Sequence, residues 1–317
     1  MKKIVLLFTF LLTIFAVLAA EPENFIPAQA PQVVRLNANR AVRMPWLKDL
    51  LSSADEKCRE ITLLLDELKK HGIESTTLFA GELWITRTAA SDQAYAVLVK
   101  TALPEAKFAE FFNTQKNKNK NVELNVSTLA GHTIYISKYA PAYKAAAGVP
   151  VFAVYLAKDV LAFMPLTDEA NLQLAALKQG GGNKLSAALD RKSLCAFAGR
   201  AVLRKEKIRS IEAQFDVSGP EQRNMNFDAT LVCKNAKTAM RKAMEFQFII
   251  PSFGGLLFGN DEKLIREITD SLQIVPVNEK IVIKFSLDKS MQEKIIKYLS
   301  NPANVTQIDI PAVSVNP

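Results

Sequence analysis

Three segments of the chain, 122–127, 210–217 and 281–287, alternate between apolar and polar side chains. A strand with this pattern buries one face and leaves the other face in water, which is typical of antiparallel sheets. Predicted helices lie between the predicted hairpins, and helices in such a position cover the apolar face of a sheet. We therefore expect an α+β fold.

A strand–strand–helix order recurs along the sequence. Strands are predicted at 82–88 and 94–100 before a helix that begins at Pro104, and again at 211–217 and 225–233 before a helix that ends near Phe248. The segments AVLVKTALPEAKFAEFF and ATLVCKNAKTAMRKAMEF align, each with Leu-Val before a basic residue and an Ala-rich helix after it. We expect antiparallel sheet built from repeated ββα units with the helices on one face, the product of an internal duplication.

Other segments extend this pattern. The predicted elements are a strand at PQVVRLNA, a helix at 45–70, a hairpin that turns at Lys158-Asp159, a helix stopped by the glycines of KQGGGNKLS, strands at 272–277 and 281–287, and a final helix at 289–299.

The first 20 residues have the three parts of a secretory signal. Lys2 and Lys3 form the positive start, and the apolar run at 4–17 is shorter than the roughly 20 residues that span a membrane. Small residues come next, so cleavage after Ala19 or Ala20 fits. The alternative is an uncleaved anchor, which the short run and its small closing residues disfavour. We expect a secreted or periplasmic protein without a transmembrane segment after cleavage.

A cut after Ala20 leaves 297 of the 317 residues, enough for one large domain or two smaller ones. The expected organisation is a signal peptide at 1–20, an extended lead at 21–31, α+β repeat halves at 32–190 and 191–300, and an extended or disordered tail at 301–317.

The formal net charge is +8, and it falls to +6 when Lys2 and Lys3 are removed. A mild positive excess favours an anionic neighbour, such as a phospholipid surface or an acidic polymer, without specifying one. Lys116, Lys118 and Lys120 are clustered without interleaved aromatic residues, which is typical of a solvated loop. No nucleic-acid partner is expected.

Two segments resemble an uncharacterised family of exported bacterial proteins with repeated strand–strand–helix units. The segment FIPAQAPQVVRLNANRAVRMPWLKDLL is similar to the family's opening strand and helix, and DVLAFMPLTDEANLQLAAL is similar to a later strand-to-helix step. The resemblance covers about residues 25 to 300 and includes no catalytic motif. The resemblance implies an exported protein of unknown function, and it identifies no functional residues in this sequence.

The sequence offers few groups for catalysis or cofactor binding. It has only two histidines, no Gly-x-Ser-x-Gly stretch and no phosphate-loop spacing. Three cysteines, Cys58, Cys195 and Cys233, lack metal-site spacing. Cys195 and Cys233 are expected as buried free thiols, with a disulfide between them as the alternative. We expect no metal and no cofactor.

One pair of carboxylates is the candidate for chemistry. When the strands at 211–217 and 225–233 are paired with their apolar sides matched, Gln214 lies opposite Asp228 and Asp216 lies opposite Asn226. Asp216 and Asp228 are then diagonal neighbours, roughly 7–8 Å apart. This separation suits glycoside hydrolysis or divalent-ion binding. The alternative is an ordinary acidic sheet face exposed to water.

The segment FIIPSFGGLLFGND, residues 248–261, is unusually apolar for a connection. Pro251 is expected to end the preceding helix, and the glycines are expected to loosen the residues after it. The large side chains are then either buried in a helix-to-helix corner or exposed as a patch. If exposed, they are the candidate contact with a partner or a membrane. These residues are Phe253, Leu256, Leu257 and Phe258.

The sequence leaves three functional hypotheses. The first is an exported, non-enzymatic scaffold or binding protein of the bacterial envelope, with an unknown envelope protein as its partner. The second is a hydrolase that uses Asp216 and Asp228. The third is a peripheral binder of an anionic membrane or polymer. The sequence favours the first.

Overall fold

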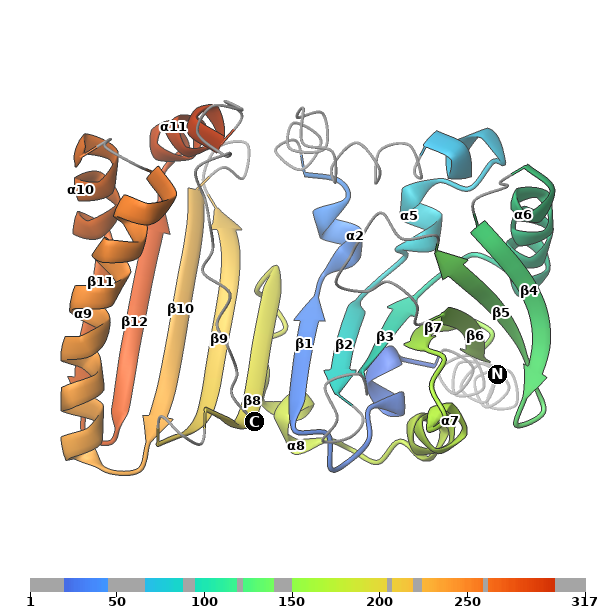
Figure 1. Cartoon of the computed structure of the whole chain (residues 1–317), viewed down its shortest axis with the longest axis horizontal. Helices are drawn as coiled ribbons and strands as arrows, with labels where there is room; N and C mark the ends of the chain where they lie inside the picture. The colour runs from blue at the N-terminus through green and yellow to red at the C-terminus, as the bar shows by residue number, and fades with distance from the viewer. Residues whose placement is uncertain are drawn as a thin grey trace, which may run out of the picture. The chain divides into compact units, whose positions relative to one another are not determined.

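The computed structural model describes residues 20–44, 66–87, 95–118, 122–139, 150–203, 207–218, 224–258 and 262–299. The chain forms two compact units (Figure 1). Unit 1 comprises Met1–Arg43 and Leu64–Leu189, and unit 2 comprises Met44–Leu63 and Asp190–Pro317.

Within its described residues, unit 1 has an antiparallel sheet in the order β1-β2-β3-β7-β6-β5-β4. The strands are β1 (Gln32–Leu36), β2 (Leu83–Arg87), β3 (Tyr95–Lys100), β4 (Val122–Leu129), β5 (His132–Tyr139), β6 (Val151–Ala157) and β7 (Val160–Pro165). The inner strands β6 and β7 are almost continuously apolar and are buried on both faces, whereas β4 lies at one edge of the order. The sheet is therefore covered on both sides at its centre.

Short helices surround this sheet. They are the 3-10 helix η1 (Pro22–Phe25), α2 (Ala38–Ala41), α5 (Ser75–Leu78), α6 (Glu105–Lys118), α7 (Ala170–Gln179) and α8 (Lys184–Ala188). Helix α6 contributes Phe108 and Phe112 to an aromatic cluster with Tyr135 and Tyr155. The edge-to-face contacts of the two phenylalanine rings with Tyr135 and Tyr155 stabilise α6 against the sheet.

Within unit 2, the strands pair antiparallel in the order β8-β9-β10-β12-β11. Its elements are β8 (Cys195–Leu203), β9 (Ile208–Ser218), β10 (Asn224–Cys233), α9 (Ala236–Phe258), α10 (Glu262–Asp270), β11 (Leu272–Val277), β12 (Lys280–Leu287) and α11 (Lys289–Leu299). Helix α9 runs beside β11 and β12 (Figure 1). Ala239 and Ala243 on α9 pack into a core with Leu231, Ile274 and Ile281.

The structure confirms the predicted α+β class with antiparallel sheet. The hairpin at Lys158-Asp159 and the three C-terminal elements lie where the sequence placed them. The predicted helix at 45–70 lies mostly outside the described residues. The expected signal peptide at 1–20, except for Ala20, and the expected tail at 301–317 also lie outside them.

One expectation about helix α9 is wrong. Pro251 does not end the helix, which continues through Gly254 and Gly255 to Phe258. A proline inside a helix removes one backbone hydrogen bond and costs about 3 kcal/mol. Helix α9 contacts β10, β11, β12 and α10, and this packing offsets the cost.

Candidate functional site

The predicted carboxylate pair lies on adjacent strands in the expected register. On β9 and β10, Asp216 is opposite Asn226 and Gln214 is opposite Asp228. Matching of apolar sides therefore predicted both pairings correctly. The two aspartates occupy diagonal positions on one face of the sheet, and both are half-buried.

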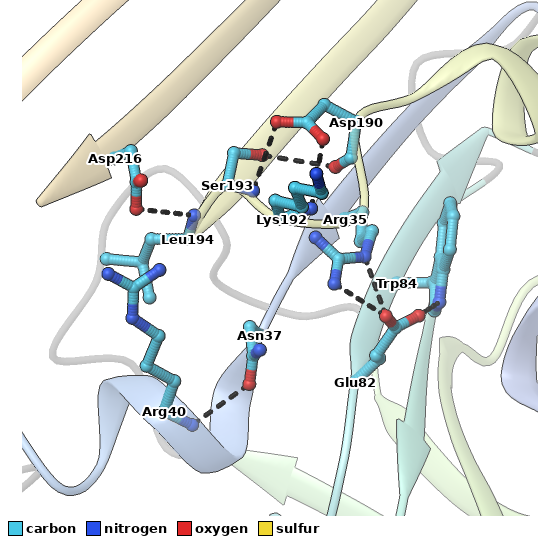
Figure 2. Close-up of polar contacts among 10 residues, drawn as sticks. All are labelled: Arg35, Asn37, Arg40, Glu82, Trp84, Asp190, Lys192, Ser193, Leu194 and Asp216. Atoms are coloured by element: carbon cyan, nitrogen blue, oxygen red, sulfur yellow. Dashed lines mark hydrogen bonds and ion pairs between the residues drawn. The ribbon is translucent and has the colours of Figure 1, made fainter.

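Asp216 fixes the start of strand β8. Its Oδ1 accepts a hydrogen bond of 3.2 Å from the backbone N–H of Leu194, which precedes the strand (Figure 2). The turn before it is held by Asp190, whose carboxylate accepts from the backbone N–H groups of Lys192 and Ser193. A carboxylate that accepts from backbone N–H groups is stabilised as an anion and organises the turn.

Asp228 belongs to a cross-strand ladder of polar side chains. It lies opposite Gln214 on one side and Lys284 of β12 on the other. In the next row, Asn226 donates to Ser218 Oγ at 3.0 Å and accepts from Ser286 Oγ at 2.9 Å. Among the residues that the structure describes, no group of three His, Cys, Asp or Glu side chains is placed to hold a metal ion.

The outer side of helix α9 carries a row of exposed apolar side chains, Met240, Met244 and Phe248. Their exposed fractions are 60%, 49% and 77%. Residues four apart share one face of a helix, so the three side chains form one continuous row. We call this set the α9 row.

The α9 row arises from the neighbouring alanines. Ala239 and Ala243 are fully buried and let the helix lie close to the sheet. The residue after each alanine, Met240 and Met244, then points about 100° away from the buried face. The sequence predicts the Ala-rich helix, but the row itself was not predicted, although Ala-Met at two positions four residues apart was a readable signal.

The predicted contact residues Phe253, Leu256, Leu257 and Phe258 lie on the last turns of α9. Their side chains lie outside what the structure describes. Phe248, the first residue of that segment, is the part that can be placed, and it is exposed. None of the helices within the described ranges is long and apolar enough to cross a membrane.

A charged cluster surrounds the first described residues of unit 1. The Lys100 ammonium is 2.6 Å from the carbonyl oxygen of Ala20, 2.8 Å from Asp159 Oδ2 and 3.3 Å from Glu21 Oε1. Lys100 is the last residue of β3, and Asp159 lies in the turn between β6 and β7. The sheet therefore brings three distant parts of the chain together.

The lead, residues 21–31, is hydrogen-bonded to the connection between α7 and α8. Asn183 Nδ2 donates to the carbonyl oxygens of Pro27, Ala28 and Ala30 at 2.8–3.2 Å, and Asn183 Oδ1 caps α8 through Leu185 and Ser186. Gly180 ends α7 as predicted. The lead contains helix η1 and is part of the packed unit.

A buried ion pair joins β1 to the start of β2. Arg35 is 2% exposed, and its guanidinium contacts Glu82 Oε1 at 2.6 and 2.7 Å (Figure 2). The other oxygen of Glu82 accepts from Trp84 Nε1 at 3.0 Å. Arg35 and Trp84 are opposite each other in the strand register. Because both carboxylate oxygens of Glu82 accept hydrogen bonds, we assign this ion pair a role in holding the two strands together.

Two tyrosines in the aromatic cluster have raised pKa values. Burial raises the pKa of Tyr135 to about 12, and the charge of Glu105, which accepts from the Tyr135 hydroxyl at 3.2 Å, adds to the increase. Burial also raises the pKa of Tyr155, whose hydroxyl donates to the Leu103 carbonyl at 2.9 Å. Both hydroxyls stay protonated at neutral pH and act as donors.

Neither Cys195 nor Cys233 forms a disulfide. Cys195 lies on β8 and Cys233 lies on β10, and both of these strands pair with β9. Cys195 is opposite Phe215 of β9, and Cys233 is opposite Ile208 of β9. These partners are seven residues apart, or roughly 23 Å along a strand, which rules out a disulfide. Burial raises the pKa of the Cys233 thiol, and the charge of Lys242 partly opposes this.

Comparison with known proteins gives little further information. No family model and no curated protein matches this sequence. Among solved structures, the chain is similar to crystal form I of TP0453, with a TM-score of 0.47 and 10% sequence identity over 88% of this chain and 98% of that one. At this TM-score and identity, we infer neither fold nor function from the likeness.

Proposed function

We propose that the protein is an exported, non-enzymatic binding protein of the bacterial envelope, periplasmic or secreted, and that it attaches to an anionic membrane surface through helix α9. The observation that carries the proposal is the α9 row. Met240, Met244 and Phe248 are large, apolar and exposed on one helix face. Exposed apolar side chains gathered on one surface mark contacts with a partner or a membrane.

The charges around this row favour an anionic surface. Lys234, Lys237 and Arg241 are exposed within or just before the same helix. Arg241 is paired with Glu245 at 3.5 Å. Each Lys or Arg close to an anionic lipid surface contributes about 1 kcal/mol of attraction. Basic and apolar side chains on one helix face are the combination that binds in the plane of a membrane interface.

The sequence beyond Glu245 extends the apolar character. No charged residue occurs between Glu245 and Asp261. This part of the chain includes Phe253 and Phe258, which are among the contact candidates selected from the sequence. We propose that they continue the contact that begins at Phe248.

The order of strands and helices adds a second part to the proposal. The order β2-β3-α6 matches the order β9-β10-α9. We propose that these are copies of one ββα unit, and that the second copy has acquired the membrane contact. The carboxylates of the rival hydrolase hypothesis take no part, because Asp216 positions Leu194 and Asp228 lies in a polar ladder.

Vesicle flotation tests the membrane contact. The mature chain should float with vesicles of phosphatidylcholine and phosphatidylglycerol, and bind vesicles of phosphatidylcholine alone much more weakly. Replacing Met240, Met244 and Phe248 together by Ser should weaken binding to the anionic vesicles at least about tenfold, since each buried apolar side chain contributes about 1.5–3 kcal/mol. High salt should also weaken binding by screening the basic residues.

Leu172→Ser is the matched control. Leu172 on α7 is 73% exposed, so its replacement removes a similar apolar side chain from a position outside the α9 row. Its vesicle binding should equal that of the wild type, and circular dichroism should show that both variants are folded. Equal binding of the triple variant and the wild type, or no binding of the wild type to anionic vesicles, would exclude the membrane contact.

A further inference from the structure

The charged cluster around Lys100 contains one more negative charge than positive charges. It consists of the Lys100 ammonium with the carboxylates of Asp159 and Glu21, a formal sum of −1. The Lys100 side chain is only 17% exposed and that of Asp159 is 26% exposed. Partly buried ion pairs of this kind are stable when charges and hydrogen bonds are matched.

The Lys100 position is built into the fold. A Cβ at residue 81 would lie 2.8 Å from Lys100 Cγ, so only glycine leaves room for the lysine side chain there. The backbone N–H of Thr101 donates to the Asp159 carbonyl at 3.0 Å, which fixes the turn that carries the aspartate. The two charged groups are therefore held by the sheet itself.

One oxygen in this cluster lacks a donor. Asp159 Oδ2 accepts from Lys100, but Asp159 Oδ1 is buried and has no hydrogen-bond partner among the described residues. A buried carboxylate oxygen without a donor costs free energy. The missing charge and the missing donor point to the same kind of group, an additional ammonium.

We propose that a peptidase hydrolyses the Ala19–Ala20 bond and that Asp159 binds the α-ammonium of Ala20 that this creates. Water adds its oxygen to the Ala19 carbonyl carbon as the C–N bond breaks. The products are an Ala19 carboxylate and an Ala20 ammonium, so atoms and charges balance. The inference rests on the export proposed above. It goes further by fixing the cleavage position and naming the residue that receives the new terminus.

Of the two cleavage positions that the sequence allows, only the one after Ala19 keeps the contact between Lys100 and Ala20. Cleavage after Ala20 would remove the carbonyl oxygen to which Lys100 donates at 2.6 Å, whereas cleavage after Ala19 keeps it. The nitrogen and the carbonyl oxygen of one residue are roughly 3 Å apart. The α-ammonium of Ala20 therefore lies roughly 3 Å from the oxygen that Lys100 contacts, and Lys100 in turn contacts Asp159.

Intact mass and N-terminal sequencing of the exported protein give the first test. The expected chain begins at Ala20. A chain that begins at Glu21 in the exported fraction overturns this inference and leaves export standing. A chain that keeps Met1 overturns export, and a comparison of two purified chains then still decides whether Asp159 binds the ammonium.

These two purified chains give the second test. One begins at Ala20, and the other carries Gly-Ser ahead of Ala20, which moves the ammonium away from Asp159. The Gly-Ser chain should melt a few degrees lower. Asp159→Asn should lower the melting temperature of both chains, because it removes the partner of Lys100, and it should lower that of the Ala20 chain by clearly more.

Asp168→Asn is the control, because Asp168 is exposed and lies outside this cluster. It should shift the two chains equally. Equal melting temperatures of the Ala20 and Gly-Ser chains overturn the ammonium site without any substitution. An equal effect of Asp159→Asn in both chains does so as well, because the aspartate would then serve Lys100 alone.

Discussion

Gly180 leaves the space that the carbonyl oxygen of Asn24 occupies. A Cβ at position 180 would overlap that oxygen, and Gly180 also has a φ of +58°. The lead and the end of α7 can approach each other only because this residue has no side chain.

Replacing Gly180 by Ala is therefore expected to destabilise unit 1 by at least about 2 kcal/mol, from backbone strain and overlap together. Gly182→Ala is the matched control, because Gly182 has a φ of +66° but open space around its Cβ position. It should cost about 1 kcal/mol. Urea unfolding measures both, and equal costs would show that the contact with Asn24 is not tight.

The buried pair of Arg35 and Glu82 predicts a large effect of neutralisation. Glu82→Gln leaves the Arg35 charge buried without its carboxylate and should cost about 3 kcal/mol. Arg35→Met combined with Glu82→Gln should cost less than the sum of the single changes. The exposed pair of Lys138 and Glu123 provides the comparison, and Glu123→Gln should change stability by about 0.5 kcal/mol or less. Additive single changes at positions 35 and 82 would contradict the pairing.

Asp216 and Asp228 should differ in their effect on stability. Asp216→Ala removes the acceptor of the Leu194 N–H and should cost about 1–2 kcal/mol. Asp228→Ala removes a cross-strand neighbour of the exposed Lys284 and should cost under about 1 kcal/mol. Chemical denaturation distinguishes the two. Equal small effects would mean that Asp216 does not position the start of β8.

Stability at alkaline pH should depend on Tyr135. Its pKa in the folded protein is about 12, above the ordinary 10.0, so the unfolded chain loses this proton first. Stability is therefore unaffected below about pH 10 and falls between about pH 10 and about 12, by at most about 1.4 kcal/mol per pH unit. Tyr135→Phe should reduce this fall in thermal melts across that range. An unchanged pH profile would place the titration on another group.

The sequence predicted the hairpins well because alternation and turn residues are local signals. The pairing of Asp216 with Asn226 came from matching apolar sides, since a shift by one residue would have reversed every side chain on β9. The strands β6 and β7 were also found, although they are apolar on both faces, because Lys158 and Asp159 mark the turn between them.

Long-range compensation explains the features that the sequence did not predict. Pro251 is a local signal for the end of a helix, but α9 continues because other elements pack along it. The α9 row depends on which side of the helix meets β11, and Ala-rich segments give no strong preference. The cluster of Lys100, Asp159 and Ala20 joins residues that lie far apart in the chain, so no spacing in the sequence reveals it.

The hydrogen bonds from Asn183 to the lead determine when the lead can dock during synthesis. Asn183 holds Pro27, a residue made 156 positions earlier. At about 5–20 residues per second, a ribosome needs roughly 10–30 s to reach it. During that interval the hydrogen bonds between Asn183 and the lead cannot form, so the lead stays undocked. The lead can take its place in unit 1 only after Asn183 has been synthesised.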